Sequence, residues 1–225
     1  MRKLDATALL SFARVPDLPL ARAWMCARLG PAIAAHVLAV MHAIPRHAFI
    51  PHRWRVAYTD LALWTGATWM TRPRTVARVL AAFPALGGAR VMETGTGSGY
   101  QTALLTALGA SVTSFEIAEG CCAEARRRLK ALGADDVAVR DENGLVAGSD
   151  SACYDAIVVN GALSAPPVSL MRYLDGGRGV VVAPVVAADG SQRLLRLESR
   201  DGSTLRMLDL GPCLYPRAVP SIERS

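Results

Sequence analysis

A glycine-rich segment, VMETGTGSGY at residues 91–100, holds the residues whose types and spacing point most directly to chemistry. Gly95, Gly97 and Gly99 alternate with small polar residues, and a residue without a Cβ lets the backbone turn sharply and approach a ligand closely. An apolar run at 89–92 precedes the segment, and a helical pattern follows it. Ligands of open α/β sheets bind outside the carboxyl ends of the strands. This segment is therefore a candidate ligand-binding turn.

Two carboxylates indicate which ligand the turn binds. The spacing G-x-G-x-G differs from the G-x-G-x-x-G that serves dinucleotide pyrophosphates, and the leading Glu93 disfavours a phosphate but suits the cationic parts of S-adenosylmethionine. Glu116 lies 21 residues after Gly95, the usual distance for a carboxylate that accepts hydrogen bonds from ribose hydroxyls. We therefore expect S-adenosylmethionine as the cofactor. A glycine turn that only connects a strand to a helix, and a nicotinamide cofactor, are the alternatives.

The elements around this turn alternate between strand-length apolar runs and helical segments. Strands separated by helices predict an α/β fold with a mostly parallel, doubly wound sheet. The last two strands flank an Asp-Gly turn at 201–202, which predicts an antiparallel edge at the carboxyl end. We expect strands at 89–93, 111–116, 137–140, 155–159, 179–185, 193–198 and 205–210, and helices at 75–82, 100–108, 119–132 and 168–174.

The amino-terminal third has a different pattern. Its first 45 residues read as helical, with apolar residues at 3.6-residue spacing from Pro31 onward and an end at Pro45. Residues 46–73 lack a clear period, which predicts packed loops and short strands. We expect one domain over 1–225, with an N-terminal helical and substrate-loop part at 1–73 and a cofactor-binding core at 74–225.

Composition and charge restrict the partners. The net charge of +6 and the pI near 9.4 favour acidic partners, but the arginines are scattered without a long basic tail, so we expect no nucleic acid. Five cysteines form no CxxC pair and four histidines have no ligand spacing, so we expect no disulfide framework, no metal and a cytoplasmic location. Arg22 and Arg28 interrupt the apolar stretch 18–44 well short of the roughly 20 residues that a membrane span needs. We expect core helices there and no membrane.

Six segments along the chain, in matching order and at matching distances, resemble the protein-L-isoaspartate O-methyltransferases. The resemblance runs from about residue 33 to residue 215. The segments are IPRHAFIP at 44–51, AYTD at 57–60, MTRP at 70–73, ETGTGSGYQ at 93–101, YDAIVV at 154–159 and GGR at 176–178. The resemblance implies the Rossmann-like class I methyltransferase fold with an N-terminal helical extension.

The resemblance also implies roles for individual residues. Glu116 holds the ribose, Asn143 sits by the adenine, and Thr71, in the place of the family's serine, contacts the substrate carboxylate. Asn160 lies at the mouth where cofactor and substrate meet, so we expect Thr71 and Asn160 to be catalytic. The residues expected to bind the cofactor are Glu93, Thr94, Gly95, Thr96, Gly97, Ser98, Gly99, Glu116, Ile117, Asn143, Gly144 and Asn160. Those expected to bind the substrate are Thr68, Trp69, Met70, Thr71 and Arg72.

Three departures from the family pattern bear mostly on the substrate. The loop that reads "GHGQTIS" in the family is TGATWMT at 65–71, which loses a glutamine and gains an indole. The family's "GDG" is Glu142-Asn143-Gly144, where an asparagine amide can still pair with an adenine edge. The family has a threonine or a small residue where this chain has Asn160. The altered loop indicates a specialised relative.

The expected chemistry needs orientation rather than a base. A carboxylate with a reference pKa of about 4 is ionised at neutral pH, so a hydroxyl and backbone N–H groups that hold one oxygen suffice, and Thr71 supplies the hydroxyl. Arg72 or Arg74 can add charge, although too tight an ion pair blunts the nucleophile. The alternative for Thr71 is helix N-capping, and Trp64 and Trp69 are either core residues or ligand platforms.

The leading hypothesis is methylation of a carboxylate of a peptide or protein, of isoaspartyl or aspartyl type, by a monomer or weak dimer. It leaves open repair of many sequences or modification of one peptide natural product. A second hypothesis is a small-molecule O- or N-methyltransferase on the same scaffold. A third is a noncatalytic peptide-binding relative, against which the nearly intact glycine-rich turn argues.

Overall fold

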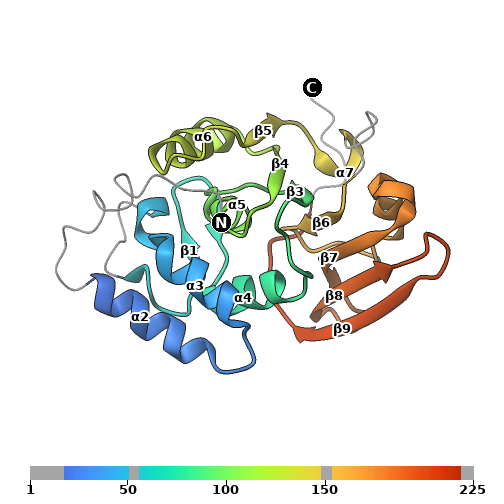
Figure 1. Cartoon of the computed structure of the whole chain (residues 1–225), viewed down its shortest axis with the longest axis horizontal. Helices are drawn as coiled ribbons and strands as arrows, with labels where there is room; N and C mark the ends of the chain where they lie inside the picture. Colours follow the sequence, from blue (N-terminus) through green and yellow to red (C-terminus); the bar gives the residue numbers. More distant parts are fainter. Residues whose placement is uncertain (1–17, 51–55, 148–153, 219–225) are drawn as a thin grey trace.

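The computed structural model describes residues 18–50, 56–147 and 154–218, and it is built around a seven-stranded sheet (Figure 1). The strand order is β5-β4-β3-β6-β7-β8-β9; the pairings from β5 to β7 are parallel, and β8 and β9 are antiparallel to their neighbours. The predicted doubly wound sheet with an antiparallel carboxyl-terminal edge is confirmed. The strands are β3 (Arg90–Thr94), β4 (Ser111–Glu116), β5 (Ala138–Asp141), β6 (Ala156–Val159), β7 (Gly179–Val186), β8 (Gln192–Ser199) and β9 (Arg206–Pro212).

The order of the strands places a ligand crevice at β3. The chain proceeds from β3 outward to β4 and β5, then crosses back to add β6 on the other side of β3. Loops that leave neighbouring strands in opposite directions open a crevice at the carboxyl ends of those strands. The glycine-rich turn directly follows β3, so it lies at this switch point.

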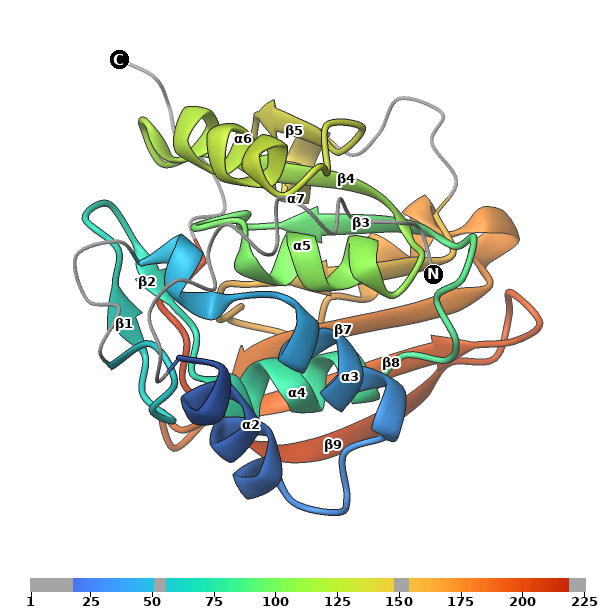
Figure 2. The same ribbon diagram turned by 60° about the vertical axis from the view of Figure 1, so that its left-hand side comes forward.

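Two apolar cores cover the two faces of the sheet, because successive side chains along a strand point to opposite faces. Val91 and Val158 belong to one core, whereas Met92 and Ile157 belong to the other. Helices α4 (Pro73–Ala81), α5 (Tyr100–Ala107) and α6 (Cys121–Ala131) contribute to the first core. Figure 2 shows α4 and α5 in front of the sheet, with α2 (Leu18–Leu29) and α3 (Ala35–Ala43) outside them.

The amino-terminal part covers this first core. The predicted helices are present as α2 and α3, and residues 1–17 lie outside the described residues. Helix α2 is only partly a core helix, because Met25 is buried but Trp24 is 55% exposed. A 3-10 turn (Arg46–Phe49) and a hairpin of β1 (Leu63–Trp64) and β2 (Trp69–Met70) follow, as expected for loops and short strands.

One predicted helix is wrong in type. Residues 168–174 form a 3-10 helix, Val168–Tyr173, with an i→i+3 bond from the Leu170 N–H to the Pro167 carbonyl oxygen at 3.0 Å. A second short 3-10 segment, Asp175–Gly177, follows, and Gly176 and Gly177 have positive φ there. The segment before these glycines is too short for an α-helix, because few hydrogen bonds can offset the entropy cost of forming the first helical turn.

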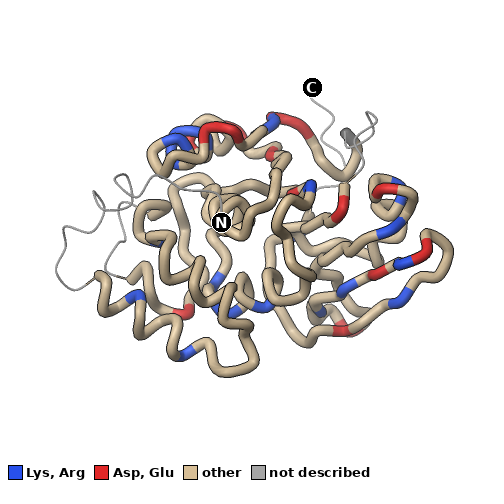
Figure 3. The backbone as a smooth tube through the Cα atoms, in the orientation of Figure 1, with Lys and Arg blue, Asp and Glu red and all other residues tan. Residues whose placement is uncertain are grey.

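Two kinds of feature are absent from the described residues, namely a membrane-spanning helix and a metal-binding cluster. Within the described ranges, no helix is long and apolar enough to cross a membrane. In the same part of the chain, no cluster of three or more His, Cys, Asp or Glu side chains is arranged to hold a metal ion. Basic and acidic residues are spread over several elements of the backbone (Figure 3).

Candidate active site

A pocket of about 170 Å³ opens at the carboxyl ends of β3, β4 and β6. It brings together most of the predicted cofactor residues and four of the five predicted substrate residues. The predicted residues that line it are Thr94, Gly95, Thr96, Gly97, Ser98, Glu116, Ile117, Asn143, Gly144, Asn160, Thr68, Trp69, Met70 and Thr71. Glu93, Gly99 and Arg72 do not line it.

The glycine-rich turn needs its glycines for conformation and for close approach. Gly95, Gly97 and Gly99 have φ values of 81°, 55° and 85°, the left-handed region that side chains rarely adopt. A Cβ on Gly95 would lie 3.1 Å from the Cβ of Asn160, at the base of the pocket. A Cβ on Gly99 would lie 3.4 Å from the Cβ of Ala125 in α6, so Gly99 packs the turn against the helix behind it.

Glu116 ends β4 with its carboxylate held by backbone N–H groups. One oxygen accepts hydrogen bonds from the Ile117 and Ala118 N–H groups, both at 2.8 Å, and the other accepts one from Gly97 at 2.6 Å. A carboxylate offers about four acceptor positions, so capacity remains for a ligand hydroxyl. The same side chain thus fixes the glycine-rich turn and faces the pocket.

Glu93 lies behind the pocket wall. It is fully buried, and one carboxylate oxygen accepts hydrogen bonds from the Thr102 and Ser114 hydroxyls at 2.5 and 2.8 Å. The other accepts from the side-chain amides of Asn160 and Gln101 at 3.0 and 3.3 Å. Burial raises the pKa of Glu93 to about 7 despite these donors. Its place differs from the expected contact with a cationic ligand and fits an indirect role.

The Asn160 side chain is bound at both ends. Its amide nitrogen donates to Glu93 and to the Gly95 carbonyl oxygen, at 3.0 and 3.1 Å. Its amide oxygen accepts a hydrogen bond of 2.8 Å from the Gln101 side chain. These hydrogen bonds hold the Asn160 side chain in place in the pocket wall, and its catalytic role stays a prediction.

Asn143 and Gly144 shape the pocket beyond β5, where the short helix α7 (Gly144–Ala147) begins. The Asn143 side-chain oxygen accepts a hydrogen bond of 3.0 Å from the Leu145 N–H group. A Cβ on Gly144 would come within 2.8 Å of the Phe115 Cβ and 2.9 Å of Thr94. The backbone of Gly144 therefore packs directly against Phe115 and Thr94, and only glycine fits this position.

The loop at 65–71 places Thr71 in the pocket wall. Helix α4 begins at Pro73 with Arg72 at its N-cap and no side-chain capping bond, so Thr71 does not cap it. The Thr71 carbonyl oxygen accepts a hydrogen bond of 3.1 Å from Arg46. Arg46 is fully buried, and it also donates to the carbonyl oxygens of Ala57 and Leu61. Burial lowers the pKa of Arg46 to about 10, so it remains charged at neutral pH.

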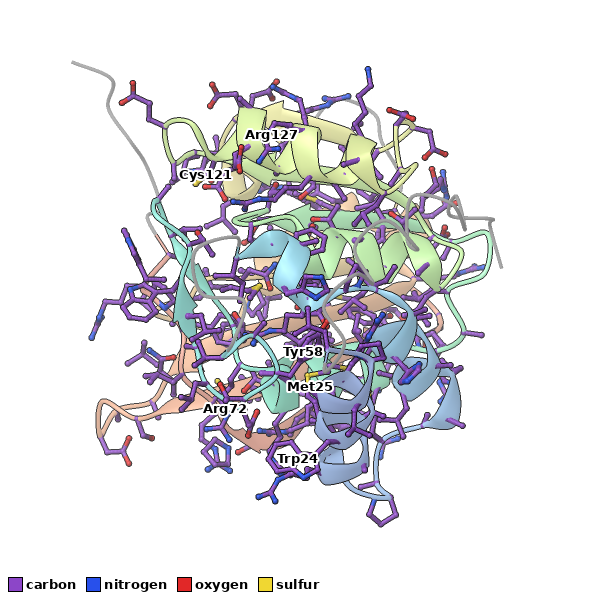
Figure 4. The ribbon with its side chains drawn as sticks, turned by 90° about the vertical axis from the view of Figure 1, so that its left-hand side faces the viewer. Trp24, Met25, Tyr58, Arg72, Cys121 and Arg127 are labelled. Atoms are coloured by element: carbon purple, nitrogen blue, oxygen red, sulfur yellow. The ribbon has the colours of Figure 1, made fainter. Side chains whose placement is uncertain are left out.

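The arginines expected near the acceptor turn away from the pocket. Arg72 and Arg74 both form ion pairs with Asp60, at 3.3 and 3.2 Å. Figure 4 shows Arg72 in the lower part of the view, on the same side of the molecule as Trp24. Arg72 is therefore a predicted substrate residue that the structure does not bring to the pocket.

The two tryptophans of the hairpin are surface residues. Trp64 and Trp69 face each other across β1 and β2, with ring centroids 5.6 Å apart and an interplanar angle of 65°. They are 41% and 52% exposed, so the alternative that they are core residues is wrong. Leu63 and Met70, on the opposite face of the hairpin, are buried instead.

Sequence reasoning missed part of the pocket wall. The residues concerned are Val76, Tyr100, Gln101, Phe115, Glu142, Leu145, Gly161 and the segment 216–218. Tyr100 and Gln101 belong to the segment ETGTGSGYQ, so their place in the pocket wall could have been predicted from that motif. The segment 216–218 carries no motif. It reaches the pocket because Ala162 donates to the Pro216 carbonyl oxygen at 2.8 Å and accepts from the Ala218 N–H at 2.9 Å.

Comparison with known proteins agrees with this geometry. Residues 26–223 match the model of the family described as Protein-L-isoaspartate(D-aspartate) O-methyltransferase (PCMT). The chain is 40% identical over 177 residues to Protein-L-isoaspartate O-methyltransferase 2 of Polaromonas sp. (strain JS666 / ATCC BAA-500), covering 77% of this chain and 83% of that protein. It is 35% identical over 191 residues to Protein-L-isoaspartate O-methyltransferase of Rhodopseudomonas palustris (strain BisB18), covering 84% and 87%.

Solved structures show the same fold. A protein-L-isoaspartate O-methyltransferase superposes with a TM-score of 0.77 at 22% identity, over 88% of this chain and 66% of that one. A Plasmodium falciparum structure described as a beta-aspartate methyltransferase in complex with S-adenosyl-L-homocysteine superposes with a TM-score of 0.75 at 16% identity, over 97% and 100%. The predicted fold class is confirmed, and the chain belongs to the protein-L-isoaspartate(D-aspartate) O-methyltransferase family.

Proposed function

We propose that this chain transfers the methyl group of S-adenosylmethionine to a carboxylate of an isoaspartyl or aspartyl residue in a peptide or protein. The observation that carries the proposal is a single pocket whose wall joins the glycine-rich turn and Glu116 to Thr71. Family membership supports the reaction, since the matched relatives are named for it. A cytoplasmic location, a monomer or weak dimer, and no binding to nucleic acid stay predictions from the sequence.

The donor side of the pocket has groups that match S-adenosylmethionine. Glu116 accepts from a ribose hydroxyl, the turn at 95–98 brings backbone close to the methionine part, and Asn143 pairs with an adenine edge. Phe115 and Gly144 line the pocket beside Asn143, at the place proposed for the adenine. When bound, the cofactor supplies an electrophilic methyl group. Glu93 and Asn160 hold the turn in place from behind, because their hydrogen bonds connect Gly95 to α5.

The acceptor side orients a nucleophile that is already charged. The carboxylate needs no general base at neutral pH, so the protein contributes position, with attacking and accepting atoms about 3 Å apart and water excluded. The Thr71 hydroxyl donates to one carboxylate oxygen and leaves the other free to attack. Arg46 fixes the backbone of Thr71 from inside the protein. Trp69, Thr68 and Met70 also line the pocket on this side.

We further propose that the acceptor is one peptide or a narrow set of peptides. The loop at 65–71 departs from the family pattern, and its exposed pair Trp64 and Trp69 offers an aromatic surface at the pocket. Solvent-exposed tryptophans on a soluble protein commonly mark a binding surface. These side chains would select residues that flank the methylated one.

A labelling experiment tests the reaction. The protein is incubated with S-adenosylmethionine labelled in its methyl group and a synthetic isoaspartyl peptide, and methyl ester is measured by its release in base. Label that depends on the isoaspartyl residue and is base-labile is expected. The same peptide with an asparagine in place of the isoaspartyl residue is the control. Label that is stable in base would assign the chain to amine or hydroxyl acceptors instead.

A further inference from the structure

The walls of the pocket carry opposite charge on its two sides. Glu116 ends β4 and Glu142 follows β5, whereas Arg217 pairs through its backbone with Ala162, just beyond β6. Because β3 lies between β4 and β6 in the sheet, the two carboxylates and the guanidinium come from opposite sides of the pocket. Among the described residues, Arg217 is the only Lys or Arg that lines it.

The side chain of Arg217 is available to a ligand. It is exposed, and it forms no ion pair or hydrogen bond with any residue that the structure describes. Arg72 and Arg74 differ, because Asp60 already pairs with both. The cation that faces the pocket therefore comes from the carboxyl-terminal segment and not from the loop before α4.

The backbone that carries Arg217 is anchored on both sides. The Gln192 side chain donates to the Tyr215 carbonyl oxygen at 2.9 Å and accepts from the Tyr215 N–H at 2.7 Å. Ala162 bonds to the carbonyl oxygen before Arg217 and to the N–H after it. A Cβ on Gly161 would lie 3.0 Å from Ala218, so the segment packs closely against the end of β6. Arg217 thus projects from a fixed position at the pocket.

We propose that Arg217 binds a second carboxylate of the acceptor, so that the site selects peptides with an acidic residue beside the methylated one. This inference rests on the proposed function. The reacting carboxylate is a poor partner for Arg217, because a close ion pair lowers the nucleophilicity of the attacking oxygen. A neighbouring acidic side chain keeps its charge throughout the reaction, so its ion pair holds the peptide without opposing methyl transfer. Glu116 and Glu142 repel the same side chain from the donor side.

The methionine part of the cofactor also carries a carboxylate, so the test separates the two sources. Two synthetic isoaspartyl peptides are compared that differ only in having Glu or Gln next to the isoaspartyl residue. Their dissociation constants are measured by fluorescence anisotropy with the protein saturated with S-adenosylhomocysteine. The affinity of S-adenosylhomocysteine itself is measured by calorimetry. The proteins are wild type, Arg217→Gln, Arg217→Glu and, as a control, Arg206→Gln, which changes an exposed arginine on β9 away from the pocket.

We expect wild type and Arg206→Gln to bind the Glu peptide about fivefold more tightly than the Gln peptide, the range of a partly solvated ion pair. Arg217→Gln loses this preference and Arg217→Glu reverses it, while the affinity of S-adenosylhomocysteine is unchanged. In wild type the preference weakens as salt is raised. A preference that survives in Arg217→Gln, or no preference in wild type, overturns the inference. So does a fivefold loss of S-adenosylhomocysteine affinity in Arg217→Gln, which would assign the guanidinium to the cofactor.

Binding and catalysis are read separately, so the two proposals fail separately. If the Glu peptide binds as expected but no base-labile ester forms, the proposed reaction is wrong and the acidic subsite stands. If ester forms on both peptides with equal efficiency and Arg217→Gln changes nothing, the reaction stands and the subsite is wrong.

Discussion

The proposed donor and acceptor sides of the pocket are built in different ways. On the donor side, buried polar groups satisfy one another: Glu93, Asn160 and Gln101 form a connected network behind the turn, and backbone N–H groups hold Glu116. On the acceptor side, Trp64 and Trp69 are exposed. A fully bonded network has one arrangement, whereas an exposed aromatic loop tolerates substitution. The bonded network therefore makes the first side the more rigid of the two.

The strongest test of this contrast removes the charge of Glu116. We expect Glu116→Gln to weaken S-adenosylhomocysteine binding by about a hundredfold, because hydrogen bonds to a charged group contribute about 1.5–3 kcal/mol. The affinity for the peptide, measured without cofactor, stays the same. Calorimetry gives the first value and anisotropy the second, and Glu119→Gln, at an exposed glutamate nearby, is the control. A loss confined to the peptide would contradict the assignment of Glu116 to the donor side.

Substitution of Thr71 tests the acceptor side, and it should impair the reaction with the peptide without changing cofactor binding. Thr71→Val keeps the shape of the side chain and removes its hydroxyl, so we expect kcat/KM for an isoaspartyl peptide to fall about tenfold. The affinity for S-adenosylhomocysteine is unchanged, and Thr71→Ser restores most of the activity. Equal activity of the valine and serine variants would show that the hydroxyl does not orient the carboxylate.

Substitution of Trp69 tests whether the acceptor side selects peptides by the residue next to the isoaspartyl residue. Trp69→Ala removes an exposed ring at the pocket, and we expect the KM of a peptide with an aromatic residue beside the isoaspartyl residue to rise about fivefold. Trp24→Ala, at a similarly exposed tryptophan on α2, leaves KM unchanged and is the matched control. The same KM change for a peptide with glycine in place of the aromatic residue would argue against a selective aromatic contact.

The contribution of the buried network to folding stability depends on pH, because the network contains the carboxyl group of Glu93. The pKa of Glu93 is about 7 in the folded protein, above its ordinary value of 4.5, because burial disfavours the charged carboxylate. A raised carboxyl pKa stabilises the fold at low pH, and this contribution is lost as pH rises from about 4.5 to about 7. Relative to Glu93→Gln, we expect the Tm of the wild-type protein to fall by about 5 °C over that window. Parallel Tm curves for the two proteins would show that Glu93 does not titrate there.

Residues with local signals were predicted well. The strand before the glycine-rich turn, the turn itself and Glu116 depend on short-range patterns, namely apolar runs, positive φ and a fixed strand-to-strand distance. The helix predicted at 168–174 was wrong because its apolar spacing says nothing about the glycines that end it so soon. The place of Trp69 was undecided, since an aromatic residue in an irregular loop has no periodicity that assigns it to a face.

By itself, then, the sequence determined the family, the sheet and the glycine-rich turn, because each depends on residues close together in the chain or at regular spacing. Only the tertiary structure decided that Glu93 lies behind the pocket and that both the amide oxygen and the amide nitrogen of Asn160 form hydrogen bonds. It also decided that Arg72 and Arg74 form ion pairs with Asp60. It also brought Arg217 beside the end of β6, which precedes it by more than fifty residues. Such contacts join distant parts of the chain, and no local pattern of residue types encodes them.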